Sequence, residues 1–358
     1  MSVLKIATYS LDTRWFTAVA ATLMIAFISH WYGCAVIVPW FFIASLVIFL
    51  SVAIFKATQT VLFNKDTLNE LFNPEKTLNL FTIVVAINFA GICFSKLFHL
   101  HTTASIFWYV SISLWLSVSL FSFSILFLYH KSEDRKIEEI FHGGWFFATA
   151  GTQSTAFLGV VVAEHATRHV MLIQLFSFAL WSSGAALYLI FMVLIIMRLI
   201  FCSLRSNTAL SPYWMNAGAA ALTALTGSTL YQYINTLGGP FVDFLPFLKG
   251  ISLFFWSAGL WWLPYLIVLA VRKQAYSDEG LVFTVGYWEI VFTLGLYASS
   301  TIQLVELFKG QYLDIVSVYF YVAFIALWCF SSVFTIIHLV SDNVQDIVHK
   351  KNGHDIVQ

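Results

Sequence analysis

The feature that most constrains this chain is a series of apolar segments, each about 20 residues long, that recurs along its whole length. A helical segment of that length matches the thickness of the hydrocarbon core of a bilayer. Only 10% of the residues are charged, against roughly 25% in soluble domains, which excludes an ordinary globular protein. Strands of a membrane barrel would be about ten residues long and would alternate in polarity, unlike these segments. The sequence therefore predicts an all-α polytopic membrane protein.

Ten transmembrane helices are predicted within a single domain that covers residues 15–340. A short N-terminal segment (1–14) precedes this domain and a C-terminal tail (341–358) follows it. Most of the 18 basic residues fall in links on the same side as both termini, and the positive-inside rule places that side in the cytoplasm. We therefore expect an integral protein of the plasma membrane, or of a bacterial or archaeal inner membrane, with both termini cytoplasmic. The predicted spans are 15–32, 35–58, 79–98, 103–129, 145–163, 169–200, 214–235, 249–271, 283–307 and 313–340.

The odd-numbered and even-numbered helices differ in their links and in their composition. Most links that follow odd-numbered helices are short, which is typical of antiparallel helical hairpins, so we expect five hairpins. Odd-numbered helices are rich in Gly, Ala, Ser and Thr, as in 143–156 and 216–229, whereas even-numbered helices carry bulky residues. In lipid, small residues indicate close contact between helix backbones. We therefore expect helices 1, 3, 5, 7 and 9 to form an inner ring around a central pore.

The ninth segment indicates how such a pore is closed. Phe292 lies just before a run of small and hydroxyl-bearing residues at 295–301. A small-residue face can line a narrow path, and a large ring beside it can plug that path. We therefore predict that Phe292 is the gate of the pore.

Polar and aromatic residues recur on the odd-numbered helices at spacings that place them on shared faces. One interpretation is a pore wall of neutral hydrogen-bonding groups, which suits a weakly held anion and equally a neutral solute. The alternative is interhelical hydrogen bonding, worth on average about 0.6 kcal/mol per bond, and for any single Ser or Thr this alternative is favoured. The pore interpretation depends on the recurrence across five alternate helices. The predicted lining residues are Thr22, Asn88, Trp145, Phe146, Thr149, Gln153, Asn216, Thr223, Thr226, Trp288, Gly295 and Ser299.

Two sets of titratable residues have alternative interpretations. Glu289 lies one turn before Phe292 and is a candidate for proton coupling. The favoured alternative places Glu289 at the cytoplasmic interface, hydrated or paired with Arg272 or Lys273. Histidines at the outer helix ends suit a sensor of external pH, or are ordinary interfacial residues, which is the favoured interpretation. They are His30, His99, His101, His165 and His169.

Several other classes of function find no support in the sequence. The formal net charge is zero, so nothing indicates a nucleic-acid partner, and the four cysteines are scattered. No HExxH, GxSxG, phosphate-binding-loop or CxxC motif occurs, and we expect neither an enzyme, nor a cofactor, nor a metal site. A membrane-embedded redox or lipid-modifying enzyme is a remote alternative.

Three segments carry a resemblance to a known family. Trp288 and Phe292 have the spacing of the family's ninth helix, and Trp145-Phe146 opens the fifth helix as in many members. Residues 212–219 and 225–229 look like helix 7 of archaeal and bacterial members. On these residues the chain resembles the tellurite-resistance/dicarboxylate transporter family, which includes bacterial tellurite-resistance proteins, yeast malate and sulfite transporters and plant guard-cell slow anion channels.

The resemblance implies a homotrimer in which each protomer has five hairpins around its own pore, blocked at mid-membrane by Phe292. Family cargoes are monovalent anions and dicarboxylates. Two positions depart from the family pattern: Thr293 stands where many members have Pro or Gly, and Ala20-Ala21-Thr22 replaces a Gly-Thr-Gly-like element of the first helix.

We therefore expect a membrane anion channel or transporter, closed at rest by Phe292, that passes small inorganic anions or C4-dicarboxylates across the lipid bilayer. The alternative is a proton-coupled dicarboxylate or sulfite secondary transporter that uses Glu289. The sequence leaves the choice of anion open, because neutral pore walls discriminate by dehydration and width.

Overall fold

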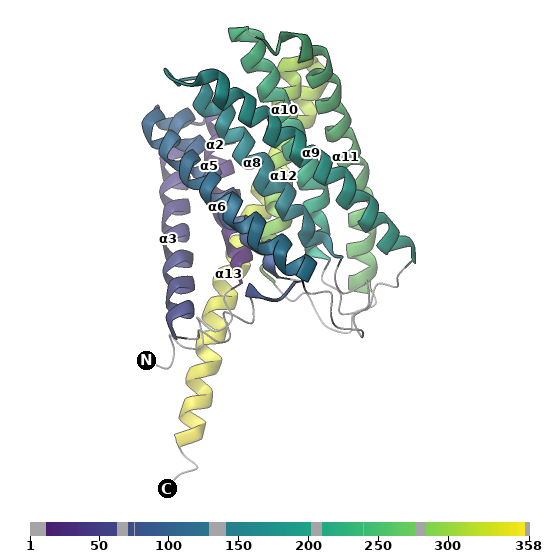
Figure 1. Ribbon diagram of the computed structural model, residues 1–358. Coiled ribbons are helices and arrows are strands. Elements are labelled where there is room, and N and C mark those ends of the chain that lie inside the picture. Colours follow the sequence, from purple (N-terminus) through teal and green to yellow (C-terminus); the bar gives the residue numbers. More distant parts are fainter. Residues whose placement is uncertain are drawn as a thin grey trace.

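Ten α-helices make up almost all of the part of the chain that the computed structural model describes, which is 12–62, 71–74, 76–128, 141–201, 210–238, 240–275 and 284–354 (Figure 1). No strand occurs in these ranges, so the predicted all-α class is confirmed. Each of the ten predicted segments coincides with one helix. The helices are α2 (Phe16–Trp31), α3 (Val38–Leu62), α5 (Phe81–Phe98), α6 (His101–Leu128), α8 (Phe146–Ala163), α9 (Val170–Phe201), α10 (Ser211–Leu237), α11 (Leu245–Ala275), α12 (Tyr287–Phe308) and α13 (Gln311–His354).

Eight of these helices are long and apolar enough to cross a membrane. The two that are not among them are α2, which has only 16 residues, and α10, which is rich in Ala and Thr. By length and composition, eight of the ten predicted segments are therefore confirmed as candidate membrane-spanning helices. For α2 and α10, helix formation is confirmed and the crossing of the membrane stays a prediction.

The helices fall into a buried set and an exposed set. In the spans that contain α5, α8 and α12, 78–100% of the most apolar stretch is buried, whereas in α3, α6, α9, α11 and α13 only 11–33% is buried. Most residues of α2 and α10 are buried as well. The buried set therefore consists of the helices that are rich in small residues, and the exposed set carries the bulky apolar side chains that suit lipid.

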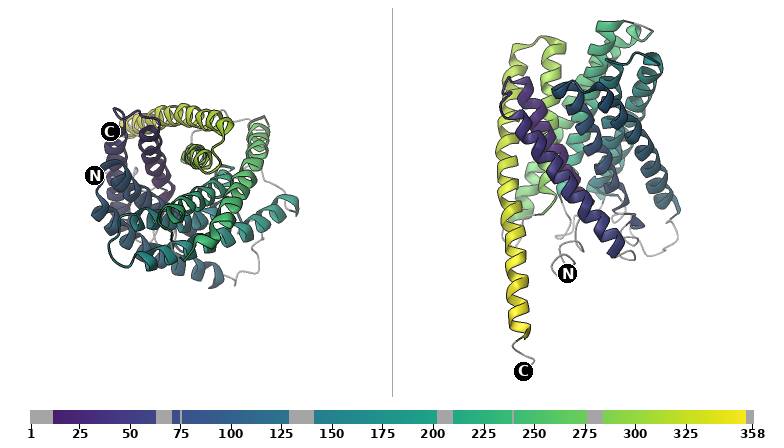
Figure 2. Two further views of the ribbon diagram at one scale, coloured as in Figure 1. Left: turned by 90° about the horizontal axis from the view of Figure 1, so that it is seen from above. Right: turned by 90° about the vertical axis from the view of Figure 1, so that its left-hand side faces the viewer.

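The contacts between helices follow a regular order. In the buried set, α2 contacts α5, α5 contacts α8, α8 contacts α10, α10 contacts α12, and α12 contacts α2. Each exposed helix packs against the buried helix that precedes it in the chain. Figure 2 shows the helices from one end of the bundle. The five buried helices thus contact one another in a closed order, and a pore inside them stays a prediction.

Close contact between the buried helices depends on glycine. A methyl group at Gly151 of α8 would come within 2.5 Å of the Phe81 ring of α5, and one at Gly218 of α10 would come within 2.7 Å of the Thr293 hydroxyl of α12. Helices in lipid gain most of their association from such close packing.

The chain reverses direction after every buried helix at one residue with a positive φ angle. Gly33 and Gly238 adopt this backbone without steric cost, and at the other three links a residue with a side chain adopts it. At the opposite end of the bundle, short 3-10 turns precede three of the buried helices: η1 (Thr13–Trp15), η2 (Thr77–Leu80) and η3 (Gly143–Trp145). A fourth turn, η4 (Val242–Phe244), precedes α11. The N-terminal ends of the five buried helices therefore lie at one end of the bundle, which we call the N-terminal mouth (Figure 1).

The last helix extends beyond the rest of the bundle. With 44 residues, α13 is about 66 Å long at 1.5 Å per residue, roughly twice the thickness of a hydrocarbon core. Figure 2 shows its C-terminal part projecting past the other helices on the side of the N-terminal mouth. The predicted tail 341–358 is therefore helical as far as His354.

Candidate functional site

Four phenylalanine rings from four buried helices form a chain of contacts; three of the rings are buried and the fourth, Phe27, is partly buried. Phe292 of α12 makes an edge-to-face contact with Phe89 of α5, with 5.6 Å between the ring centroids. Phe89 contacts Phe157 of α8 at 6.3 Å, and Phe157 contacts Phe27 of α2 at 6.5 Å. We call these four residues the aromatic cluster. Edge-to-face packing of this kind is the favoured geometry for aromatic pairs.

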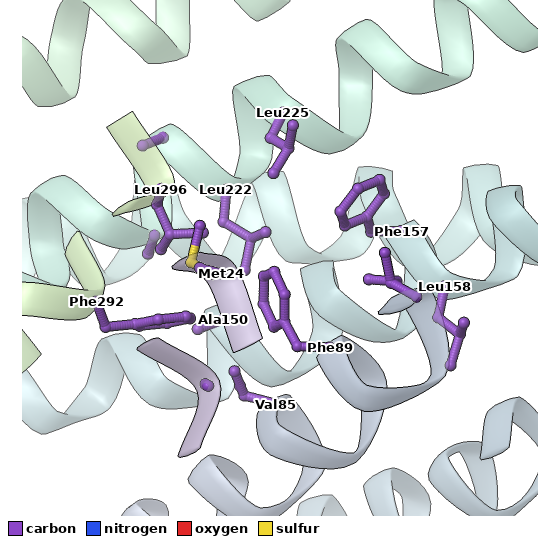
Figure 3. Close-up of a cluster of buried hydrophobic side chains, with 14 of the residues drawn as sticks. Met24, Val85, Phe89, Ala150, Phe157, Leu158, Leu222, Leu225, Phe292 and Leu296 are labelled. Carbon is purple, nitrogen blue, oxygen red and sulfur yellow. The ribbon is translucent and has the colours of Figure 1, made fainter. Parts of the chain in front are cut away.

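The fifth buried helix completes the apolar surroundings of the aromatic cluster. Leu222 and Leu225 of α10 lie beside the rings, together with Met24 of α2 and Leu296 of α12 (Figure 3). Phe292 is only 1% exposed and Phe89 is fully buried. All five buried helices therefore contribute side chains to one apolar region inside the bundle.

Phe89 and Phe157 were not identified from the sequence. Phe292 is recognisable because a run of small residues follows it, whereas Phe89 and Phe157 are two among the 36 phenylalanines of the chain. The signal that would have found them is that each lies on a helix rich in small residues, close to the middle of its span.

Three of the four threonines predicted to line the pore donate hydrogen bonds within their own helices. The hydroxyl groups of Thr22, Thr223 and Thr226 donate to backbone carbonyls one turn earlier, at 2.8, 2.8 and 2.9 Å. The side-chain amide of Gln153 donates to the Trp181 carbonyl of α9 at 3.0 Å. The hydrogen bond to Trp181 places Gln153 on the face of α8 that meets α9.

The two asparagines in the predicted set join helices. Asn88 of α5 donates to the hydroxyls of Ser154 and Thr155 of α8, both at 3.0 Å. Asn216 of α10 accepts a hydrogen bond from the Tyr188 hydroxyl of α9 at 3.0 Å. Both amides therefore link neighbouring helices, as interhelical hydrogen bonding predicts.

The larger residues of the predicted set pack against exposed helices. The ring contacts are Trp145 with Phe191 and Phe146 with Tyr188, both on α9, and Trp288 with Trp328 on α13. The structure therefore brings the three aromatic positions next to the outer helices. A methyl group at Gly295 would come within 3.0 Å of the Phe324 ring of α13 and 3.2 Å of the sulfur of Met24 of α2, so Gly295 lies between an outer helix and the surroundings of the aromatic cluster.

Four predicted lining residues carry a buried polar atom that has no hydrogen-bond partner among the described residues. These atoms are Asn88 Oδ1, Thr149 Oγ1, Gln153 Oε1 and Ser299 Oγ. Burying a polar group without a hydrogen-bond partner lowers the stability of the fold by about 1–3 kcal/mol, so such atoms are uncommon in folded proteins. Ser299 lies seven residues, or about two turns, beyond Phe292 and therefore on the same face of α12.

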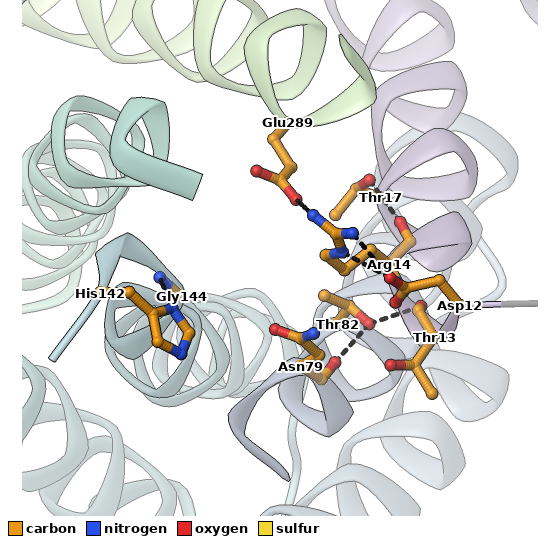
Figure 4. Close-up of polar contacts among 9 residues, drawn as sticks. All are labelled: Asp12, Thr13, Arg14, Thr17, Asn79, Thr82, His142, Gly144 and Glu289. Carbon is orange, nitrogen blue, oxygen red and sulfur yellow. Dashed lines mark hydrogen bonds and ion pairs between the residues drawn. The ribbon is translucent and has the colours of Figure 1, made fainter. Parts of the chain in front are cut away.

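A second feature is a group of three charged side chains at the N-terminal mouth, of which Glu289 is buried and Asp12 and Arg14 are partly buried. The Asp12 carboxylate accepts from Nε and Nη2 of Arg14, both at 2.7 Å, and Glu289 of α12 accepts from Nη1 at 3.2 Å. Glu289 is fully buried. Figure 4 shows these three side chains with Asn79 and His142 nearby. We call Asp12, Arg14 and Glu289 the charged triad.

Backbone contacts fix the position of Arg14. The Thr17 hydroxyl donates to the Arg14 carbonyl at 2.6 Å, and the Thr82 hydroxyl of α5 donates to the Thr13 carbonyl at 2.9 Å. Burial acts against the charged guanidinium, but the Glu289 and Asp12 carboxylates outweigh it and raise the pKa of Arg14. Burial also acts to raise the pKa of Asp12, but Arg14 and Lys56 outweigh it, so this pKa lies below its usual value.

The partner of Glu289 differs from the one that the sequence suggested. Arg14 forms the ion pair, whereas Arg272 is exposed on α11 and the side chain of Lys273 lies outside the described residues. Glu289 is also buried rather than hydrated. The sequence does not identify Arg14 as the partner of Glu289, because the two residues are 275 positions apart along the chain. They meet because α2, which follows Arg14, packs against α12.

Titratable groups also gather at the opposite end of the bundle. The rings of His101 and His165 stack with 3.6 Å between centroids, and Lys96 donates to Glu164 at 2.5 Å. The Ser95 hydroxyl lies 3.0 Å from Nδ1 of His101. Burial and the neighbouring His101 lower the pKa of His165, although Glu164 acts in the opposite direction.

Acidification is expected to weaken this end of the bundle through His165. A histidine in the unfolded chain has a pKa of about 6.5, and that of His165 is lower in the folded protein. Protonation of His165 is therefore less favourable in the folded protein than in the unfolded chain. The free energy of unfolding is at its full value above about pH 6.5 and decreases as the pH falls below that value. We expect the apparent melting midpoint in detergent to fall less between pH 7.5 and 5.5 in His165→Gln than in the wild type. The control is His30→Gln, and an equal fall in all three proteins would contradict the prediction.

Comparisons with known proteins identify related sequences. A sequence profile of the voltage-dependent anion channel family matches residues 10–336. An uncharacterized transporter of Methanocaldococcus jannaschii is 25% identical over 259 residues, 71% of this chain and 72% of the relative. A sulfite efflux pump of Trichophyton rubrum is 23% identical over 201 residues, 53% of this chain and 52% of the pump. The profile match includes the aromatic cluster and the charged triad.

Proposed function

The chain belongs to the voltage-dependent anion channel family, and from this premise we propose that it carries small anions across a membrane between helices α2, α5, α8, α10 and α12. The observation that carries the proposal is the aromatic cluster, to which four of these five helices each contribute a ring. In this proposal five antiparallel helix pairs surround an axis, with the buried helix of each pair inside. Family membership favours transport over catalysis.

Phe292 is the proposed gate, with Phe89 as its immediate support. A dry apolar constriction stops ions because they would have to shed their water there. Phe292 can leave the axis only if the edge-to-face contact with Phe89 is broken. On the same face of α12, the hydroxyl of Ser299, which has no hydrogen-bond partner among the described residues, is a proposed lining group beyond the gate.

The proposed cargo is a small oxyanion, with sulfite as the first candidate. Support comes from relatives that are named sulfite efflux pumps. A proton-coupled carrier is the second candidate function, because the charged triad places a buried carboxylate one turn from the gate. C4-dicarboxylates, a homotrimer, a plasma-membrane location and cytoplasmic termini complete the proposal on the basis of the family resemblance.

Anion flux from liposomes tests the proposed function. The purified protein is reconstituted, and the efflux of chloride, nitrate and malate is compared with that from protein-free liposomes, with and without an applied potential. Efflux that follows the potential and ranks the anions supports a channel, and efflux that needs a proton gradient supports the carrier. Equal efflux with and without protein, for all three anions, would contradict anion transport.

A further inference from the structure

The charged triad holds its two carboxylates unequally. Asp12 contacts two nitrogens of the Arg14 guanidinium at 2.7 Å, while Glu289 contacts one nitrogen at 3.2 Å. The second oxygen of Glu289, Oε2, has no hydrogen-bond partner among the described residues, although the side chain is fully buried. Glu289 is therefore the weaker partner of Arg14 and the one that a competing anion can replace.

Arg14 is also well placed to meet an anion. Helices α2, α5, α8, α10 and α12 contain no arginine, and their lysine, Lys96 of α5, lies at the opposite end of the bundle. The N-terminal ends of these helices surround the mouth where Arg14 lies, and such ends carry partial positive charge. Glu289 is only three residues, about one turn, from Phe292. An anion on Arg14 would therefore lie directly before the gate.

We infer that Arg14 is an oxyanion-binding residue, on which an incoming oxyanion replaces Glu289 while Glu289 takes up a proton. This inference rests on the proposed function and adds to it the binding group and the coupling step. In that step the hydrogen bond from Nη1 of Arg14 to Glu289 breaks, and a hydrogen bond from Arg14 to an oxygen of the anion forms. The proton comes from the solution and binds a carboxylate oxygen of Glu289.

The balance of charge ties the proton to the anion. With Glu289 ionised, the charged triad holds one positive and two negative charges. A bound anion would add a third negative charge beside Arg14, which is strongly unfavourable in a site that is shielded from water. When Glu289 takes up a proton as a monovalent anion binds, the total charge of the site stays the same. The Ser211 hydroxyl of α10 also faces this carboxyl group, and the side chains of Asn79 before α5 and His142 before α8 lie at the same mouth.

The shape of the guanidinium group selects for oxyanions. It presents parallel N–H groups that match two oxygens of one nitrate, sulfite or carboxylate, and a halide cannot use both in that way. Lysine keeps the positive charge but lacks the pair of parallel N–H groups. The variant Arg14→Lys therefore separates recognition of an oxyanion from simple attraction of negative charge.

Nitrate is the probe for the experiment, because it does not titrate near neutral pH, and chloride is the matched halide. In liposomes, we expect Arg14→Lys to raise the half-saturating nitrate concentration about tenfold, the loss of about 1.4 kcal/mol of binding, with little change for chloride. In Glu289→Gln, which has no carboxylate to protonate, the number of protons taken up per nitrate transported should fall to zero. An unchanged nitrate-to-chloride preference in Arg14→Lys, or proton uptake that persists in Glu289→Gln, would overturn the inference.

A binding measurement keeps this test separate from that of the proposed function. Nitrate is expected to raise the melting midpoint of the wild-type protein in detergent, and to do so much less in Arg14→Lys. If wild-type protein shows no flux in liposomes but nitrate still stabilises it through Arg14, the proposed function fails and the binding site stands. If flux occurs and nitrate stabilises both proteins equally, the binding site fails alone. Size-exclusion chromatography confirms that each variant is folded.

Discussion

Replacement of Phe292 with alanine is expected to raise anion flux by at least about tenfold, since each 1.4 kcal/mol removed from a barrier raises a rate tenfold. The physical reason is that the Phe292 ring is 1% exposed and packs against Phe89, so that its loss would open the proposed constriction to water and ions. The measurement is efflux of chloride and nitrate from liposomes that contain equal amounts of wild-type or variant protein.

The control for this prediction removes an equally buried ring elsewhere. Phe255 of α11 is also 1% exposed, and it packs against Tyr188 of α9 rather than within the aromatic cluster. Both substitutions delete the same atoms and should cost a similar stability, about 3–5 kcal/mol in the core of a soluble protein. We expect Phe255→Ala to leave flux at the wild-type level. A folded Phe292→Ala protein with wild-type flux would show that this ring does not close the path.

The second large effect is expected at the contact between η3 and α10. A methyl group at Gly143 would come within 2.3 Å of the carbonyl carbon of Pro212 and 2.4 Å of the Tyr213 backbone nitrogen. Overpacking typically lowers the free energy of unfolding by 1–3 kcal/mol, and we expect a loss of about the upper value here because backbone atoms on both sides must move. We expect the Gly143→Ala variant to give much less folded protein than the wild type, as measured by the monodisperse fraction in size-exclusion chromatography and by the melting midpoint.

Gly250→Ala provides the matched control. Gly250 lies within α11, and among the described residues no atom beyond its chain neighbours and the adjacent helix backbone lies within 4 Å of the position that its methyl group would take. Alanine is favoured over glycine in a helix by about 1 kcal/mol, so this variant should be as stable as the wild type or more stable. Equal losses in both variants would mean that alanine at either position disturbs insertion into the membrane, and the packing argument at Gly143 would be wrong.

The fold was largely predictable because small and bulky residues segregate by helix. The run of Gly, Ala, Ser and Thr in 143–156 predicts close packing, and α8, which contains most of it, is fully buried in the structure. In contrast, α13 carries aromatic and branched residues and is among the most exposed helices. Lipid supplies no hydrophobic drive between helices, so the size of the side chains decides which helices meet.

The candidate site was only partly predictable. Phe292 stands out in the sequence, but its partner Phe89 lies on another helix and has no local signal. Arg14 and Glu289 are 275 residues apart along the chain, whereas other basic residues, such as Arg272, lie closer to Glu289 in the sequence. Polar residues such as Gln153 were predicted from shared faces, yet a helix in the interior is surrounded on every side. Periodicity alone therefore cannot tell which neighbour a buried side chain meets.

The most direct test of the path asks whether an anion that crosses the protein passes Ser299, two turns beyond Phe292 on the same face of α12. In a Phe292→Ala protein whose four native cysteines are replaced, Ser299→Cys is treated with a membrane-impermeant, negatively charged thiol reagent. The reagent should reach the new cysteine and block anion flux, whereas a cysteine at exposed Ser113 of α6 should leave flux unchanged. Continued flux with Ser299→Cys unmodified would contradict an anion path between the five buried helices.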